Sequence, residues 1–158
     1  MTNISCTIEG PHRGFSGPLA KTAWEIPEPA AEKTPLRVLV VDDESLIRWS
    51  VAETLTGLGM TVVQAVDAGS ALDAIGAAGR CFDVIVLDLR LPDMSDLTLV
   101  AAVRACAPDA AVVLMTAFGT PGIVTAAYDL GVVNVLNKPF ELDELSRVVT
   151  AAGQTAAR

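Results

Sequence analysis

Residues 36–44, LRVLVVDDE, place a run of apolar residues directly before three carboxylates. The unbroken series Val38-Leu39-Val40-Val41 is typical of a parallel strand that is buried on both faces. Four further short apolar runs follow along the chain, each bounded by turn or charged residues. We therefore predict five strands, at 36–41, 61–65, 84–87, 111–115 and 134–136.

Stretches with helical spacing separate and follow the predicted strands. Apolar residues recur three or four positions apart in each of them, as at Ile47, Val51 and Leu55. Asp67 is a helix start signal and Gly131 a stop signal. Crossovers between parallel strands are right-handed, and a buried sheet needs helices on both faces. The sequence therefore predicts an α/β fold, a (βα)5 doubly wound parallel five-stranded sheet with its ligand site at the carboxyl ends of the strands.

The amino-acid composition limits the classes of function that this protein can have. The chain has 158 residues, which suits one globular domain, and it is 51% hydrophobic but only 4% aromatic, which indicates an aliphatic core. Eleven Lys and Arg against 19 Asp and Glu give a net charge of −8, and no basic patch is visible. Direct binding of nucleic acid is therefore not expected.

The cysteines indicate the compartment of the protein, and changes in composition along the chain indicate the limits of its domain. Cys6, Cys81 and Cys106 show no C-x-x-C spacing, and we expect two of them to be small buried hydrophobes in a reducing, cytoplasmic compartment. No secretory signal is visible, and Gly and Pro interrupt the uncharged stretch 110–128, so no membrane span is predicted. We expect a flexible Pro-rich extension over residues 1–35, a domain over 36–153 and a tail over 154–158.

Polar residues follow the predicted strands at the edge where a ligand site is expected. Asp42 and Asp43 follow the first strand, Asp88 the third, Thr116 the fourth and Lys138 the fifth. Carboxylates that gather in one place repel one another, and a cation such as Mg²⁺, which prefers oxygen ligands, offsets the repulsion. The lysine and the hydroxyl are suited to hold phosphate oxygens. Together these groups predict phosphoryl transfer to Asp88.

Four motifs in this order carry a family resemblance: residues 38–44 (VLVVDDE), 83–93 (DVIVLDLRLPD), 115–117 (MTA) and 137–140 (NKPF). The sequence resembles the receiver domain of two-component response regulators. The stretch 115–120, MTAFGT, is similar to receivers of transcriptional activators of the nitrogen-regulator type. The resemblance implies a flavodoxin-like sheet with strand order 2-1-3-4-5. It also implies a cycle in which a sensor histidine kinase phosphorylates the domain, which then signals by changing conformation.

The resemblance also implies a role for each site residue. Asp88 matches the phosphoacceptor, and Asp42 and Asp43 match the acidic pair that binds Mg²⁺, with the backbone carbonyl of Arg90 as a further ligand. Thr116 and Lys138 match the hydroxyl and the lysine that contact the phosphoryl group. Pro139 matches a position with a cis peptide bond. Self-phosphorylation and autodephosphorylation, rather than turnover of a substrate, are the implied chemistry.

Two positions depart from the family pattern, and a third, Phe118, lies at a place that varies within the family. Val135 stands where the family usually has an aromatic switch residue, so coupling is expected to run through Thr116, Phe118 or backbone shifts instead. Asp96 stands where Gly is common, and it tolerates left-handed geometry better than most residues. Phe118 lies near the site entrance, where an apolar side chain would hinder attacking water.

Partners and rival functions stay open at this level. The chain ends soon after its fifth helix, so we expect it either to bind a downstream protein or to be a fragment of a longer regulator that has an output domain. A homodimer through the fourth helix, fifth strand and fifth helix, near Tyr128, Asp129, Glu144 and Arg147, is a further option. One rival is a receiver-like interaction module that works without phosphorylation. The other is an aspartyl-nucleophile phosphatase, which commonly needs a second Asp where this chain has Arg90.

Overall fold

A computed structural model describes residues 34–78, 81–94 and 96–156. The chain divides into two units after Lys33, and the described residues all belong to the second unit, Thr34–Arg158. The predicted extension over residues 1–35 thus falls almost wholly outside the described residues and stays a prediction. In the second unit, strands and helices alternate along the described chain as the sequence pattern predicts.

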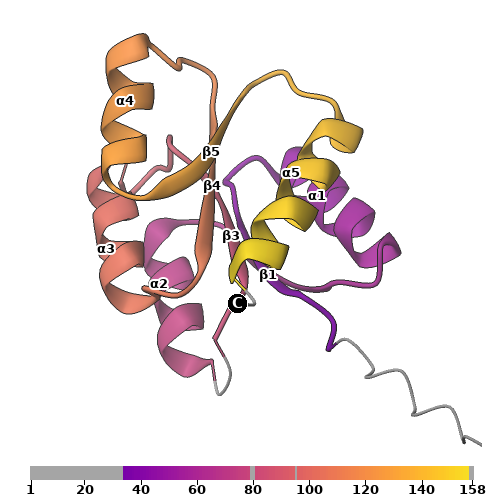
Figure 1. Cartoon of the computed structure of the whole chain (residues 1–158). Coiled ribbons are helices and arrows are strands. Elements are labelled where there is room, and N and C mark those ends of the chain that lie inside the picture. Colours follow the sequence, from indigo (N-terminus) through magenta and orange to yellow (C-terminus); the bar gives the residue numbers. More distant parts are fainter. Residues whose placement is uncertain (1–33, 79–80, 95, 157–158) are drawn as a thin grey trace, which may run out of the picture. The chain divides into compact units, whose positions relative to one another are not determined.

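Five parallel strands form one sheet in this described part (Figure 1). They are β1 (Arg37–Val41), β2 (Thr61–Ala65), β3 (Val84–Asp88), β4 (Ala111–Thr116) and β5 (Val132–Asn137). Their order is β2-β1-β3-β4-β5, and all neighbouring pairs are parallel. The predicted α/β class, doubly wound topology and strand order are confirmed.

Five helices pack on the sheet in the described residues, and some of their ends fall at signals that the sequence carries. They are α1 (Ser45–Gly57), α2 (Ala68–Ala77), α3 (Thr98–Cys106), α4 (Pro121–Asp129) and α5 (Leu142–Ala156). Asp67 caps α2 through a reciprocal bond with Ser70, and Thr120 caps α4 just before Pro121. Gly131 follows α4 with a φ of 86°, a left-handed conformation that glycine adopts without strain.

The core consists of two apolar layers, one on each face of the sheet. Alternate residues of β1 point to opposite faces, so Leu39 and Val41 belong to one layer and Val38 and Val40 to the other. Helices α2, α3 and α4 cover the first face, whereas α1 and α5 cover the second (Figure 1). This double cover explains why the β1 sequence is apolar at consecutive positions.

Three details differ from the sequence-based expectations. Strand β5 begins at Val132 instead of residue 134, because Val132 pairs with Val112 before a register shift at Val112/Val113. Cys81 and Cys106 are exposed instead of buried: Cys81 precedes β3 in a loop, and Cys106 is the last residue of α3. Helix α5 continues to Ala156, past the domain end expected at 153. None of the helices in the described residues is long and apolar enough to cross a membrane.

Candidate functional site

The polar residues at the carboxyl ends of four strands meet at one edge of the sheet. Asp42 directly follows β1, Asp88 and Thr116 are the last residues of β3 and β4, and Lys138 directly follows β5. The register aligns these ends, since Val41 pairs with Leu87 and Asp88 pairs with Met115. Among the described residues, the buried polar or charged ones are Asp42, Asp88 and Thr116, all at this edge. Buried polar groups thus concentrate where the sequence predicted chemistry.

Three carboxylates at this edge lie close enough to share a cation. Asp42, Asp43 and Asp88 each offer an oxygen, and these atoms all lie within 4.8 Å of one another. Asp42 and Asp88 are buried, whereas Asp43 is exposed. Burial raises the pKa of the Asp42 carboxyl above its usual value, although a hydrogen bond from Lys138 opposes this. A set of oxygen donors that carries excess negative charge fits Mg²⁺.

Lys138 joins the carboxylates through its amine. Its Nζ lies 2.9 Å from Asp42 Oδ2, 2.8 Å from Asp88 Oδ2 and 3.2 Å from Glu44 Oε1. Burial alone would lower the pKa of the amine, but the hydrogen bonds to Asp88 and Asp42 outweigh it and raise this pKa. Lys138 is therefore charged at neutral pH and offsets part of the negative charge of the cluster.

The two buried carboxylates are held in the same way. Oδ1 of Asp42 accepts a hydrogen bond from the Glu44 amide at 2.8 Å, and Oδ1 of Asp88 accepts one from the Arg90 amide at 3.0 Å. In each residue the other oxygen faces Lys138. The N-cap position of α1 belongs to Glu44, whose side chain makes no capping bond, so neither Asp42 nor Asp43 serves as the helix cap.

Thr116 accepts hydrogen bonds from the loop after β4 and from the residue after β5. Its Oγ1 accepts a hydrogen bond from the Phe118 amide at 3.1 Å, while its carbonyl accepts one from the Lys138 amide at 2.7 Å. The loop after β4 lies so close to β5 that a Cβ at Gly119 would collide with Asn137 Oδ1. The peptide bond between Lys138 and Pro139 is cis, as the resemblance implies.

Two further predicted residues stand at the rim of the site. The Arg90 guanidinium lies over the Phe118 ring, with Cζ 5.0 Å from the ring centroid. Phe118 is 63% exposed. The Arg90 amide bonds Asp88, but the predicted use of its carbonyl as a metal ligand stays a prediction.

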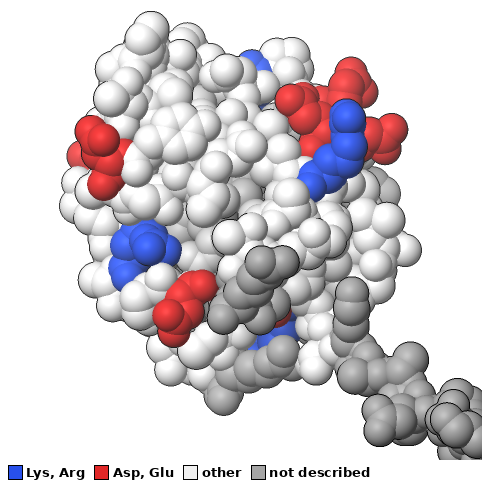
Figure 2. Space-filling view, in the orientation of Figure 1, with Lys and Arg blue, Asp and Glu red and all other residues white. Residues whose placement is uncertain are grey.

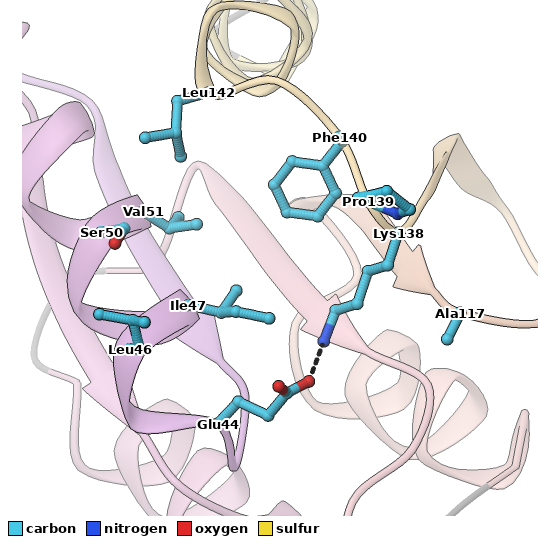
Figure 3. Close-up of a pocket in the computed structure, with 10 residues that line it drawn as sticks. All are labelled: Glu44, Leu46, Ile47, Ser50, Val51, Ala117, Lys138, Pro139, Phe140 and Leu142. Atoms are coloured by element: carbon cyan, nitrogen blue, oxygen red, sulfur yellow. Dashed lines mark hydrogen bonds and ion pairs between the residues drawn. The ribbon is translucent and has the colours of Figure 1, made fainter.

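An apolar groove of about 540 Å³ opens beside Lys138. Leu46, Ile47 and Val51 of α1 form one wall, and Pro139, Phe140 and Leu142 form the other (Figure 3). Glu44 and Lys138 stand at the end nearest the carboxylates, joined by their ion pair (Figure 3). The groove therefore reaches the edge of the site from the side of α1.

A family model for the response regulator receiver domain matches residues 38–150. The chain belongs to this family. Over 115 residues the receiver domain is 35% identical to the DNA-binding transcriptional regulator NtrC of Escherichia coli, covering 73% of this chain and 24% of NtrC. It is also 35% identical over 111 residues to response regulator MprA of a Mycobacterium species, covering 70% of this chain and 47% of MprA. A CheY-like receiver domain structure from Methanospirillum hungatei shares the fold, with a TM-score of 0.73 at 22% identity, covering 78% of this chain and 98% of that protein.

The family sets the function of the receiver domain. It is a receiver of two-component signalling with a phosphoacceptor role, and not a classical enzyme. Such domains work with histidine kinases and output domains and bind Mg²⁺ at an acidic pocket. The chain spans about a quarter of the NtrC relatives that it matches.

Two residues at this edge of the receiver domain, Glu44 and Asp93, had no role predicted from the sequence. Glu44 contacts Lys138, and its position directly after the acidic pair was a visible signal. Asp93 reaches the start of α2, 24 and 25 residues earlier in the chain. No local pattern predicts such a contact, because it depends on how β2 and β3 both pair with β1 in the sheet.

Proposed function

We propose that Asp88 is the phosphoacceptor of this receiver domain. The observation that carries the proposal is the position of its carboxylate, buried at the end of β3 with Oδ2 2.8 Å from Lys138 Nζ. One oxygen of Asp88 attacks phosphorus, and the bond from phosphorus to the leaving group of the donor breaks. With a phosphohistidine donor the leaving group is the imidazole nitrogen, which keeps the electron pair and takes up a proton.

Asp42, Asp43, Asp88 and the carbonyl of Arg90 would hold Mg²⁺. The ion supplies positive charge that offsets the charge of the phosphoryl oxygens. Lys138 is placed to exchange a carboxylate partner for a phosphoryl oxygen, because its amine already lies among three acceptors. Thr116 would turn its hydroxyl from the Phe118 amide towards the phosphoryl group and draw the loop after β4 with it.

The conformational signal would pass through this loop. Val135 replaces the usual aromatic and packs against the core on the α4 side of the sheet, so no aromatic ring rotates there. A shift of Thr116 would act on Phe118 and on Gly119, which lies against Asn137 of β5. Phosphorylation then favours one of two existing conformers of the region around α4 and β5.

Partners would meet the domain on two surfaces. A sensor histidine kinase would use the apolar groove, because this groove ends at Lys138 and leads to Asp88. A downstream protein, an output domain or a second copy would use the face with α4, β5 and α5, where Tyr128 and Val133 are 47% and 45% exposed. Figure 2 shows this face as mostly uncharged, with acidic side chains gathered beside a basic one over the start of α5 and only scattered charges elsewhere. The net charge of −8 disfavours direct contact of the chain with nucleic acid, and the cytoplasm is the proposed location.

Acetyl phosphate tests the proposal without a kinase. We expect the wild type with MgCl₂ and acetyl phosphate to gain about 80 Da, one phosphoryl group in place of a proton. Asp88→Asn, which keeps the size of the side chain, should gain nothing, and EDTA should prevent the gain in the wild type. Equal labelling of both proteins would exclude Asp88 as the acceptor.

The same experiment separates the rival functions. A folded wild type that neither binds Mg²⁺ nor gains mass would be an interaction module without phosphorylation. Continuous release of phosphate from a generic phosphomonoester would indicate an aspartyl phosphatase. The Arg90 position disfavours the phosphatase, since that class commonly has a second Asp there.

A further inference from the structure

The start of α2 is bonded by two carboxylates from different parts of the chain. Asp67, the N-cap residue, accepts a hydrogen bond from the Ser70 amide at 2.7 Å. Asp93 accepts one from the Ala68 amide and one from the Gly69 amide, each at 3.0 Å and each with a different oxygen. Asp67 is part of the helix end that it caps, whereas Asp93 belongs to the loop between β3 and α3. Only the second carboxylate therefore ties two separate segments together.

The loop that Asp93 ties down begins at the proposed phosphoacceptor. The Arg90 amide bonds Asp88 Oδ1 at 3.0 Å, and the Leu91 amide bonds the Met94 carbonyl at 3.2 Å. Leu91 itself is buried. The Arg90 carbonyl thus lies between two fixed points of the loop. On one side the Arg90 amide is hydrogen-bonded to Asp88, and on the other side the Leu91–Met94 turn contains Asp93.

We propose that Asp93 is a positioning residue for the Mg²⁺ site, because its bonds to α2 fix the loop that carries the Arg90 carbonyl. The inference rests on the proposed function, in which this carbonyl is a metal ligand. The attraction between a carboxylate and the positive end of a helix strengthens the tether. The backbone bonds from Ala68 and Gly69 also lower the pKa of the Asp93 carboxyl, so it stays ionised at neutral pH.

A matched pair of variants separates positioning from simple capping. Asp93→Ala removes the tether, and Asp67→Ala removes the local cap from the same helix end. Titration calorimetry with MgCl₂ measures the dissociation constant, and urea unfolding in EDTA measures the stability of each variant. Partners outside the first ligand shell commonly change metal affinity by about ten- to a hundredfold. We expect Asp93→Ala to weaken Mg²⁺ binding by about tenfold, whereas Asp67→Ala loses stability but binds Mg²⁺ as the wild type does.

Asp93→Asn is expected to have an intermediate effect. Its side-chain amide keeps one acceptor oxygen for the start of α2, so this variant should bind Mg²⁺ with an affinity between those of the wild type and Asp93→Ala. Equal affinities for the wild type and Asp93→Ala would overturn the inference and leave the phosphoacceptor proposal standing. Equal weakening by Asp67→Ala would also overturn it, because helix capping alone would then explain the change. A wild type that binds no Mg²⁺ would overturn the proposed metal site and the tether together.

Discussion

Carboxylates at the two edges of the sheet have opposite surroundings. At the amino edge, Asp83 precedes β3 and accepts a hydrogen bond from the Arg37 amide at 2.7 Å, while Arg37 lies over the Phe82 ring at 5.1 Å. At the carboxyl edge, Asp42, Asp43 and Asp88 offer oxygens that lie within 4.8 Å of one another. The first arrangement satisfies a single carboxylate locally, whereas the second gathers charges that repel.

The number of charges at each edge explains this contrast. At the amino edge the single carboxylate of Asp83 accepts a hydrogen bond from a backbone amide. At the carboxyl edge Asp42 and Asp88 also accept hydrogen bonds from backbone amides, and their other oxygens share the one amine of Lys138. Three carboxylates beside one amine leave this edge with excess negative charge. Carboxylates placed there need a cation, which is a condition for binding metal and phosphate.

The largest effect is expected from Lys138→Met at the carboxyl edge. The change keeps much of the side chain's apolar length but leaves the buried carboxylates of Asp42 and Asp88 without their shared amine. Breaking a buried ion pair costs about 3 kcal/mol, so the free energy of unfolding in EDTA should fall by about that amount. Saturating MgCl₂ should recover part of the loss in urea unfolding, while labelling by acetyl phosphate disappears. Unchanged stability in EDTA would contradict the charge argument.

Asp83→Ala makes the reciprocal change at the amino edge. The Arg37 amide loses its carboxylate partner, and we expect the free energy of unfolding to fall by about 1 kcal/mol. Mg²⁺ affinity and acetyl phosphate labelling should match the wild type, because the bond lies at the opposite end of β3. A clear loss of labelling in this variant would break the proposed separation between the two edges.

The smallest effect on stability is expected at Asp93. This carboxylate lies near the carboxyl edge, but it accepts hydrogen bonds from backbone amides, as Asp83 does at the amino edge. Its pKa is lowered in the folded state, so its stabilisation is complete above the unfolded pKa of about 3.9 and is lost as pH falls through the folded pKa. Urea unfolding of the wild type and Asp93→Asn should differ by a constant amount between about pH 5 and pH 7. The difference should shrink at lower pH, and a difference that grows there would contradict the assignment.

Much of this molecule could be predicted from local patterns. The apolar series before Asp42 indicated a strand buried on both faces, and Asp67 and Gly131 marked helix ends that the structure confirms. The alternation of strands and helices predicted a parallel sheet, which in turn placed the predicted site residues at one edge. Exposure of Cys81 and Cys106 was predicted wrongly, because apolar neighbours in the sequence do not show which side of a helix end or loop faces solvent.

The sequence by itself therefore determined the class of fold and the edge at which polar groups meet, since both follow from residue periodicity and strand direction. Only the tertiary structure decided which atoms touch. Lys138 reaches Asp42, Glu44 and Asp88 from 50 to 96 residues away, and Asp93 reaches α2 from 24 and 25 residues away. Such contacts depend on strand order, register and side-chain reach together, because a hydrogen bond needs its atoms within about 3 Å. Residue patterns along the chain specify elements, and distances of that kind exist only after the elements have packed.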